Sequence, residues 1–261
     1  MGDAALRLTD VKVTRDGRDI LGPVDWVVGP DERWVVLGPN GSGKSTMVKI
    51  ASLQLHPSRG EVEVLGEVLG HTDVRKLRER VGYAAAALAD VLRPSITARD
   101  VVMTARHAAL EPWWHQYDDD DRAQALDCLD RLGVAHLAAR EFGTLSSGER
   151  QRVLVARTLM GDIGLVLLDE PNAGLDVGGR EWLVAGLDDL AADVATPAMV
   201  LVTHHVEEIP PSFTHALLVR DGRFQAAGPI EETLTADKLS ATFGLELELQ
   251  RRAGRWTAWA T

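Results

Sequence analysis

A glycine-rich loop between an apolar run and a helical segment constrains the fold of this chain more than any other feature. The apolar run is Arg33–Leu37, and the loop Gly38–Thr46 follows it directly. The loop reads as a glycine, four residues, a second glycine, a lysine and a serine, which is the spacing of phosphate-binding loops. Glycines let successive backbone N–H groups turn inward at a helix start, where the helix dipole also favours an anion. The segment therefore predicts a strand, a loop and a helix that bind nucleotide phosphates.

Every residue of this loop is a candidate contact for the nucleotide. We expect Lys44 to neutralise the β and γ phosphates and to take part in catalysis, and the Ser45 hydroxyl to ligate Mg²⁺. The candidate ATP-binding residues of the loop are Gly38, Pro39, Asn40, Gly41, Ser42, Gly43, Lys44, Ser45 and Thr46.

Two carboxylates end a second apolar run. Leu165–Leu168 has the continuous apolar character of a buried strand, and Asp169 and Glu170 follow it. Open parallel sheets bind their ligands at the C-terminal ends of the strands. We therefore expect Asp169 to hold Mg²⁺ together with Ser45, and Glu170 to polarise the water that attacks the γ-phosphate.

The remaining periodicity predicts an α/β fold. A helix should follow the loop over residues 44–55, and Leu183, Leu187, Leu190 and Val194 should form the apolar stripe of another helix. Strands are expected within residues 5–37 with a turn at 16–18, as a half-exposed hairpin strand at 61–68, and at 165–168, 199–202 and 216–219. Because strands and helices alternate, the central sheet should be parallel.

Two further segments differ from this alternation. Residues 94–160 have helical spacing at Leu126, Leu129 and Leu132, and the acidic run 118–121 suits a helix N-terminus better than a metal site. This stretch is predicted to be a helical insertion. The C-terminal end should carry a helix over 231–243 and two strands that flank Ala253-Gly254.

Charge and composition narrow the choice of partners. The 261 residues carry a formal net charge of -11 and lack a long basic stripe, so nucleic acid is not an expected partner. No apolar run approaches the roughly 20 residues that span a bilayer, and the start at Met1–Asp3 lacks the regions of a signal peptide. The single cysteine, Cys128, cannot form an internal disulfide. We expect a cytoplasmic protein that reaches a membrane only through another chain.

A third motif lies between the first two and indicates a family. Leu145–Arg152 resembles the signature motif of ABC-type ATPases, 172–176 resembles their D-loop, and His204 resembles their switch histidine. The resemblance covers nearly the whole chain. It implies a P-loop NTPase core with a mixed, largely parallel sheet, an N-terminal antiparallel β subdomain and an inserted α-helical subdomain. The expected limits are 1–90 and 161–230 for the core, 91–160 for the helical subdomain and 231–261 for a C-terminal appendage within one domain.

The resemblance also implies how the site is assembled. ABC-type ATPases form head-to-tail dimers, with the same chain or with a second cassette, in which the signature helix of one subunit closes on the γ-phosphate held by the other. The residues expected to act on ATP in this way are Ser146, Ser147, Gly148 and Asp176. Glu170, His204 and Lys44 are the expected catalytic residues, with ATP and Mg²⁺ as ligands; His205 is not chosen.

Two positions in the chain depart from the family, and one pair of tryptophans allows two interpretations. Ala86 stands where the family has a glutamine that touches the metal and senses the membrane subunit, and alanine cannot ligate metal. Arg15 stands where an aromatic residue commonly stacks on adenine, and it is either a stacking guanidinium or a solvated surface residue. Trp113 and Trp114 fit either core packing or docking to a membrane partner.

The expected function is that of the cytoplasmic ATPase subunit of a transporter, lying against the inner face of the cell membrane and driving a separate permease. The segments 97–102 and 228–230 resemble those of subunits that serve metal-complex importers. Two alternatives stay open: a soluble ABC-type switch without a permease, favoured by the missing glutamine, and a cassette that binds nucleotide but hydrolyses it poorly beside a stronger subunit.

Overall fold

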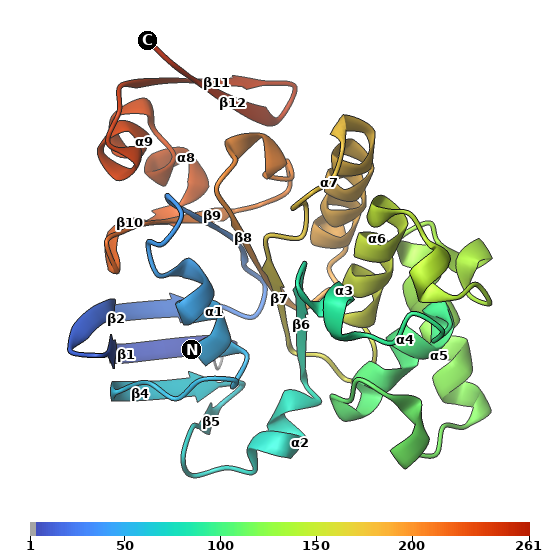
Figure 1. Ribbon diagram of the computed structural model, residues 1–261. Coiled ribbons are helices and arrows are strands. Elements are labelled where there is room, and N and C mark those ends of the chain that lie inside the picture. The colour runs from blue at the N-terminus through green and yellow to red at the C-terminus, as the bar shows by residue number, and fades with distance from the viewer. Residues whose placement is uncertain (1–3) are drawn as a thin grey trace.

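A six-stranded sheet forms the centre of the computed structural model, which describes residues 4–261 (Figure 1). Its strand order is β10-β9-β3-β8-β7-β6. All neighbours pair in parallel except β10, which runs antiparallel to β9. The strands are β3 (Arg33–Leu37), β6 (Val81–Ala85), β7 (Leu165–Asp169), β8 (Ala198–Thr203), β9 (His215–Arg220) and β10 (Arg223–Pro229). The predicted α/β class and the parallel core are confirmed.

A four-stranded antiparallel sheet lies beside this core, as the predicted N-terminal β subdomain requires. Its order is β2-β1-β4-β5, and the expected turn at 16–18 connects the first two strands through Asp16 and Gly17, which both have positive φ. The segment 61–68, predicted to be one hairpin strand, instead contributes to two paired strands, because Leu65 and Gly66 form a turn within it. The strands are β1 (Leu6–Arg15), β2 (Arg18–Val28), β4 (Arg59–Val64) and β5 (Glu67–Val68).

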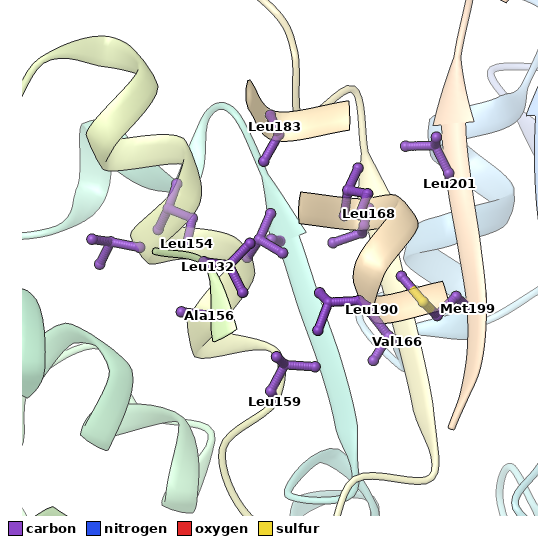
Figure 2. Close-up of a cluster of buried hydrophobic side chains, with 14 of the residues drawn as sticks. Leu132, Leu154, Ala156, Leu159, Val166, Leu168, Leu183, Leu190, Met199 and Leu201 are labelled. Atoms are coloured by element: carbon purple, nitrogen blue, oxygen red, sulfur yellow. The ribbon is translucent and has the colours of Figure 1, made fainter. Parts of the chain in front are cut away.

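Alternate residues of the central strands point into two separate hydrophobic cores. On β7, Val166 and Leu168 face one core while Leu165 and Leu167 face the other. Helix α1 (Lys44–Ala51) packs into the second core, with the antiparallel sheet, whereas α6 (Ser147–Arg157) and α7 (Val177–Ala192) pack into the first. Figure 2 shows the first core between these two helices and the sheet. Helices α1 and α6 therefore cover opposite faces of the sheet.

Helices fill the chain between β6 and β7, where the insertion was predicted. The acidic run forms the expected helix start, because Asp118 and Asp121 cap α5 reciprocally. Leu129 and Leu132 are buried, but Leu126 is exposed on the outer side. The segments are α3 (Leu88–Val91), α4 (Ala98–Met103), α5 (Asp119–Arg131), α6, and the 3₁₀ turns η1 (Thr104–His107), η2 (Pro112–Trp114), η3 (Ala135–Leu137) and η4 (Phe142–Thr144). The short helix α2 (Val74–Arg78) precedes β6.

Three sequence-based details were wrong. The helix after the loop ends at Ala51 rather than at residue 55, and Leu53 has a left-handed φ of 63°. Val194 is not on the apolar stripe of α7: it is 96% exposed, because the helix ends at Ala192. The single predicted C-terminal helix is two helices, α8 (Ile230–Thr233) and α9 (Ala236–Phe243).

The chain ends in a two-stranded hairpin of β11 (Leu247–Arg252) and β12 (Arg255–Ala260), joined at the predicted Ala253-Gly254 turn. The 3₁₀ turn η5 (Val206–Glu208) follows β8 and lies against β12. Within residues 4–261 no helix is long and apolar enough to cross a bilayer. The sequence-based assignment at Met1–Asp3 lies outside the described residues, and the limits at 90, 160 and 230 stay predictions.

Candidate functional site

The loop Gly38–Thr46 connects β3 to α1, as predicted, and close packing explains Gly38 and Gly43. Gly43 precedes the first turn of α1 with φ 101°, and a Cβ atom there would lie 2.9 Å from the Ile20 carbonyl oxygen. A Cβ atom on Gly38 would lie 2.0 Å from the Val219 carbonyl oxygen. Larger residues would push the loop away from these neighbours, so the glycines set the path of the backbone that is to face phosphate.

Lys44 is buried, and the hydrogen bonds of its ammonium group go to backbone carbonyl oxygens. Its Nζ donates to the carbonyl oxygens of Gly38 at 2.7 Å and Pro39 at 3.0 Å. No carboxylate within residues 4–261 forms an ion pair with it, and burial lowers the pKa of Lys44 against the opposing charges of Glu170 and Asp169. A buried cation without an anionic partner is costly. The site therefore suits a bound anion such as a phosphate group.

Ser45 and Asp169 lie together although they are far apart in the chain. The Ser45 hydroxyl donates to Asp169 Oδ1 at 3.2 Å. Burial raises the pKa of Asp169, and the hydrogen bond from Ser45 opposes this rise. Mg²⁺ is commonly bound by one or two protein oxygens together with substrate phosphates and water. The pair fits such an ion, and residues 4–261 contain no cluster of three or more His, Cys, Asp or Glu side chains that would hold a metal without phosphate.

Glu170 and His204 meet where β7 and β8 end. His204 Nδ1 lies 3.2 Å from Glu170 Oε1. Glu170 has a left-handed φ of 50°, an unusual conformation that is held by its N–H donating to the Val202 carbonyl at 2.9 Å. The neighbouring His205 contacts His204 ring to ring, with centroids 4.1 Å apart, and makes no hydrogen bond to Glu170. The histidine chosen from the sequence is thus the one that the fold places against the carboxylate.

A cavity of about 270 Å³ lies beside Glu170 and His204, and its lining includes residues that the sequence analysis had not selected. Asn172 is 4% exposed, and both polar atoms of its amide are buried without a partner in the described structure. Glu208 is also buried and accepts a hydrogen bond from the Thr203 hydroxyl. Asn172 was visible in the predicted D-loop segment, but only the fold shows its amide beside Glu170.

The predicted signature residues begin α6 on the other face of the sheet. Ser146 caps this helix and Glu149 donates its backbone N–H to the Ser146 hydroxyl at 3.3 Å, while the Glu149 carboxylate accepts from the Ser146 N–H at 2.7 Å. A Cβ atom on Gly148 would lie 3.6 Å from the Cα of Gly179, in the first turn of α7. Ser147 is the first residue of α6. The signature residues therefore adjoin the start of α7 within the same chain.

Asp176 is the N-cap of α7 and accepts the Gly179 N–H at 2.7 Å. Across residues 4–261, no hydrogen bond or ion pair joins Asp176 or the signature residues Ser146–Gly148 to the loop Gly38–Thr46. The fold thus brings Lys44, Ser45, Asp169, Glu170 and His204 together, whereas Ser146–Gly148 and Asp176 form none of the hydrogen bonds or ion pairs that join this group.

Three other candidates have distinct surroundings. Ala86 directly follows β6 and is half-buried, and Arg15 is exposed at the end of β1. Trp113 is 58% exposed and lies under the guanidinium of Arg93, whose Cζ is 4.1 Å from the ring centroid. Core packing is therefore wrong as the explanation of Trp113, while the side chain of Trp114 lies outside the described part of the structure.

A second cavity, of about 400 Å³, lies between β6 and the helical insertion. Its lining combines apolar side chains with the arginines Arg78 and Arg157 and contains no carboxylate. Burial and, to a smaller extent, the Asp169 carboxylate raise the pKa of Tyr83, which also lines it, to about 12.

Residues 21–173 match the ABC transporter family. The chain is 38% identical over 239 residues to the ABC transporter ATP-binding protein YlmA of Bacillus subtilis, and the alignment covers 91% of this chain and 90% of that protein. It is 35% identical over 254 residues to the hemin import ATP-binding protein HmuV of Nocardia farcinica, over 95% of this chain and 85% of that protein. A dimeric ATP-binding cassette solved in a post-hydrolysis state with ADP and Pi has a TM-score of 0.72 at 24% identity, over 86% of this chain and 98% of that chain.

Proposed function

The chain belongs to the ABC transporter family of ATP-binding proteins and is an ATPase, and from this premise we propose that it is the subunit that powers a separate membrane permease. The observation that carries the proposal is the meeting of the buried Lys44, which forms no ion pair within residues 4–261, with the pairs Ser45–Asp169 and Glu170–His204 at the C-terminal edge of one parallel sheet. This arrangement provides a phosphate site, a metal site and a base in adjacent positions.

We assign the chemical roles as follows. The backbone N–H groups of Gly38–Thr46 and the Lys44 ammonium hold the β and γ phosphates of ATP. Glu170 orients the attacking water and accepts its proton, and His204 fixes the Glu170 carboxylate through the 3.2 Å contact and contacts the γ-phosphate. Ser45 and Asp169 would hold Mg²⁺, which when bound neutralises charge on the phosphates. Water forms a bond to the γ phosphorus as the bond to the leaving ADP oxygen breaks.

We further propose that two cassettes, two copies of this chain or this chain with a second cassette, combine head to tail around ATP. Ser146–Gly148 and Asp176 stand at the starts of α6 and α7, which pack into the core on the opposite face of the sheet from α1. The exposed start of α6 offers free backbone N–H groups and the Ser147 hydroxyl to an anion. These groups would complete the site of the partner, in agreement with the similarity to a dimeric cassette.

The cavity between β6 and the helical insertion is the proposed contact for the permease. It adjoins β6, whose last residue Ala85 pairs with Asp169, so a segment bound there acts on a strand of the catalytic edge. The exposed Leu110 and Trp113 lie in the same helical insertion and offer apolar area to a partner. The protein would then be peripheral to the inner face of the cell membrane.

For the cargo we propose a metal complex. The similarity to a hemin import ATP-binding protein and the resemblance of segments 97–102 and 228–230 to metal-complex importer subunits support this class. The alternative is a soluble switch without a permease, and Ala86 favours it, since no amide is present there to sense a membrane subunit.

Co-purification separates these two functions. The tagged Glu170→Gln variant is expressed in its native host, membranes are solubilised in mild detergent with ATP, and the bound proteins are identified. We expect a stoichiometric protein with several membrane spans. Recovery of soluble proteins only would reject the permease and favour the switch.

A further inference from the structure

The C-terminal hairpin lies on the loop that carries His204. Trp256 of β12 is buried in the same core as Val206 and Ile209, which belong to η5 and the residue after it. At the turn of the hairpin, a Cβ atom on Gly254 would lie 3.1 Å from Pro211 Cβ, so the hairpin follows the chain beyond η5 as well. The hairpin therefore packs along the segment that begins two residues after His204.

Arg255 joins this segment to α7. Its Nη1 and Nη2 bind the two carboxylate oxygens of Glu181 at 2.7 Å and 3.2 Å, and Nη2 also donates to the Glu207 carbonyl oxygen at 2.6 Å. On the same strand, the Ala258 N–H lies 3.5 Å from a Glu207 carboxylate oxygen. Glu181 is in the second turn of α7, which starts at Asp176. One guanidinium thus holds both the helix that follows the D-loop and the turn that follows His204.

The chemistry of η5 explains why this support matters. A single 3₁₀ turn satisfies few of its own carbonyl groups, so an outside donor is needed to fix its backbone. Arg255 provides that donor at Glu207, and the bidentate pair with Glu181 fixes the direction of the guanidinium. The hydrogen bond from Arg255 is also the main cause of the lowered pKa of Glu181.

We propose that the C-terminal hairpin is a clamp on the His204 loop and that Arg255 is a positioning residue for ATP hydrolysis. Without Arg255 the turn after His204 is held less firmly, and the contact between His204 and Glu170 is populated for a smaller fraction of the time. Arg255 touches neither Lys44 nor the phosphate loop, so ATP binding is unaffected. The proposal rests on the roles assigned above to Glu170 and His204, but not on the existence of a permease.

The partly exposed ion pair predicts a functional effect that is larger than the effect on stability. The side chains of Arg255 and Glu181 are 30% and 45% exposed, and ion pairs at such positions add little to stability. A displacement of a catalytic group by about 1 Å, in contrast, lowers a rate by as much as roughly 100-fold. The loss of the Arg255 contacts alone should lower the rate of hydrolysis by less than that limit, by about tenfold.

The test compares Arg255→Ala with Arg252→Ala in the full chain. Arg252 is exposed and pairs with Arg255 across the hairpin, and its side chain forms no hydrogen bond or ion pair within residues 4–261. We expect Arg255→Ala to lower kcat for ATP by about tenfold with KM within about twofold, and to speed amide hydrogen exchange in residues 204–209. Arg252→Ala should behave as the wild type, and Arg255→Lys, which keeps one donor, should lie between the two.

Equal kcat values for Arg255→Ala and Arg252→Ala would overturn the clamp. If Arg255→Ala does not fold, Glu181→Gln replaces it, since it weakens the same pair without removing the guanidinium, and an unchanged kcat in that variant overturns the proposal. His204→Ala separates the two levels of inference: if His204→Ala hydrolyses ATP normally, the assigned site is wrong, whereas an inactive His204→Ala with a normal Arg255→Ala rejects only the clamp.

Discussion

Replacing Glu170 with glutamine tests the assigned base most directly. Glutamine has nearly the same shape, and its amide oxygen can still accept from His204 at the 3.2 Å position of the carboxylate oxygen. The backbone hydrogen bond to Val202 and the left-handed φ do not depend on the side-chain charge. The change therefore removes the ability to accept a proton and leaves the surroundings in place.

The expected size of the effect follows from these contacts. Loss of a general base lowers kcat by about 100- to 10,000-fold, which corresponds to roughly 3–5 kcal/mol of activation free energy. The Glu170 side chain is 31% exposed, so the free energy of unfolding should change by less than about 0.5 kcal/mol. The affinity for ATP should stay within about threefold, because Lys44 and its loop are unchanged.

Steady-state phosphate release, equilibrium binding of ATP and thermal unfolding measure the three quantities. Glu61→Gln is the matched control, since Glu61 is exposed on β4 and its side chain forms no hydrogen bond or ion pair within residues 4–261. A kcat within tenfold of the wild type, with ATP affinity unchanged, would refute Glu170 as the base. A large fall in melting temperature would instead contradict the claim that the carboxylate is not needed for folding.

Three further predictions concern single buried side chains. Burial raises the pKa of Asp169, so ionisation of this carboxyl group destabilises the fold as pH rises through the raised pKa. Asp169→Asn should therefore have a higher melting temperature than the wild type at pH 7 and lose this advantage below the ordinary carboxyl pKa. The same variant should lose Mg²⁺-dependent hydrolysis. Burial raises the pKa of Cys128 to about 11, so a thiol reagent at pH 8 should label the native chain slowly and the urea-unfolded chain at one equivalent, and rapid native labelling would contradict the described packing. Leu154→Ala, at a fully buried position of α6, should lower the free energy of unfolding by about 2–5 kcal/mol in urea titrations, and a loss below 1 kcal/mol would show that the core relaxes around the cavity.

Local sequence determined the elements that carry the site. The glycine spacing of Gly38–Gly43 and the apolar runs that end in Leu37 and Asp169 predicted a strand, a loop and a helix at one sheet edge, because backbone conformation and strand burial depend on nearby residues. Those predictions of fold class are confirmed. The sequence did not predict where the helix α7 ends. Val194 continues the apolar spacing of this helix but lies beyond its last residue, so the prediction that it is on the apolar stripe was wrong.

Tertiary structure alone decided which distant residues meet. The motif order had selected His204 over His205, but the contact of its Nδ1 with Glu170 exists only because β8 ends beside β7. The burial of the Asn172 amide and the contact of Arg255 with Glu207 likewise depend on sheet order and packing across many residues. The short-range pattern of apolar and polar residues determines which helices and strands form. Contacts between these elements depend on the burial of both faces of the sheet at once, and no local spacing in the chain predicts that arrangement.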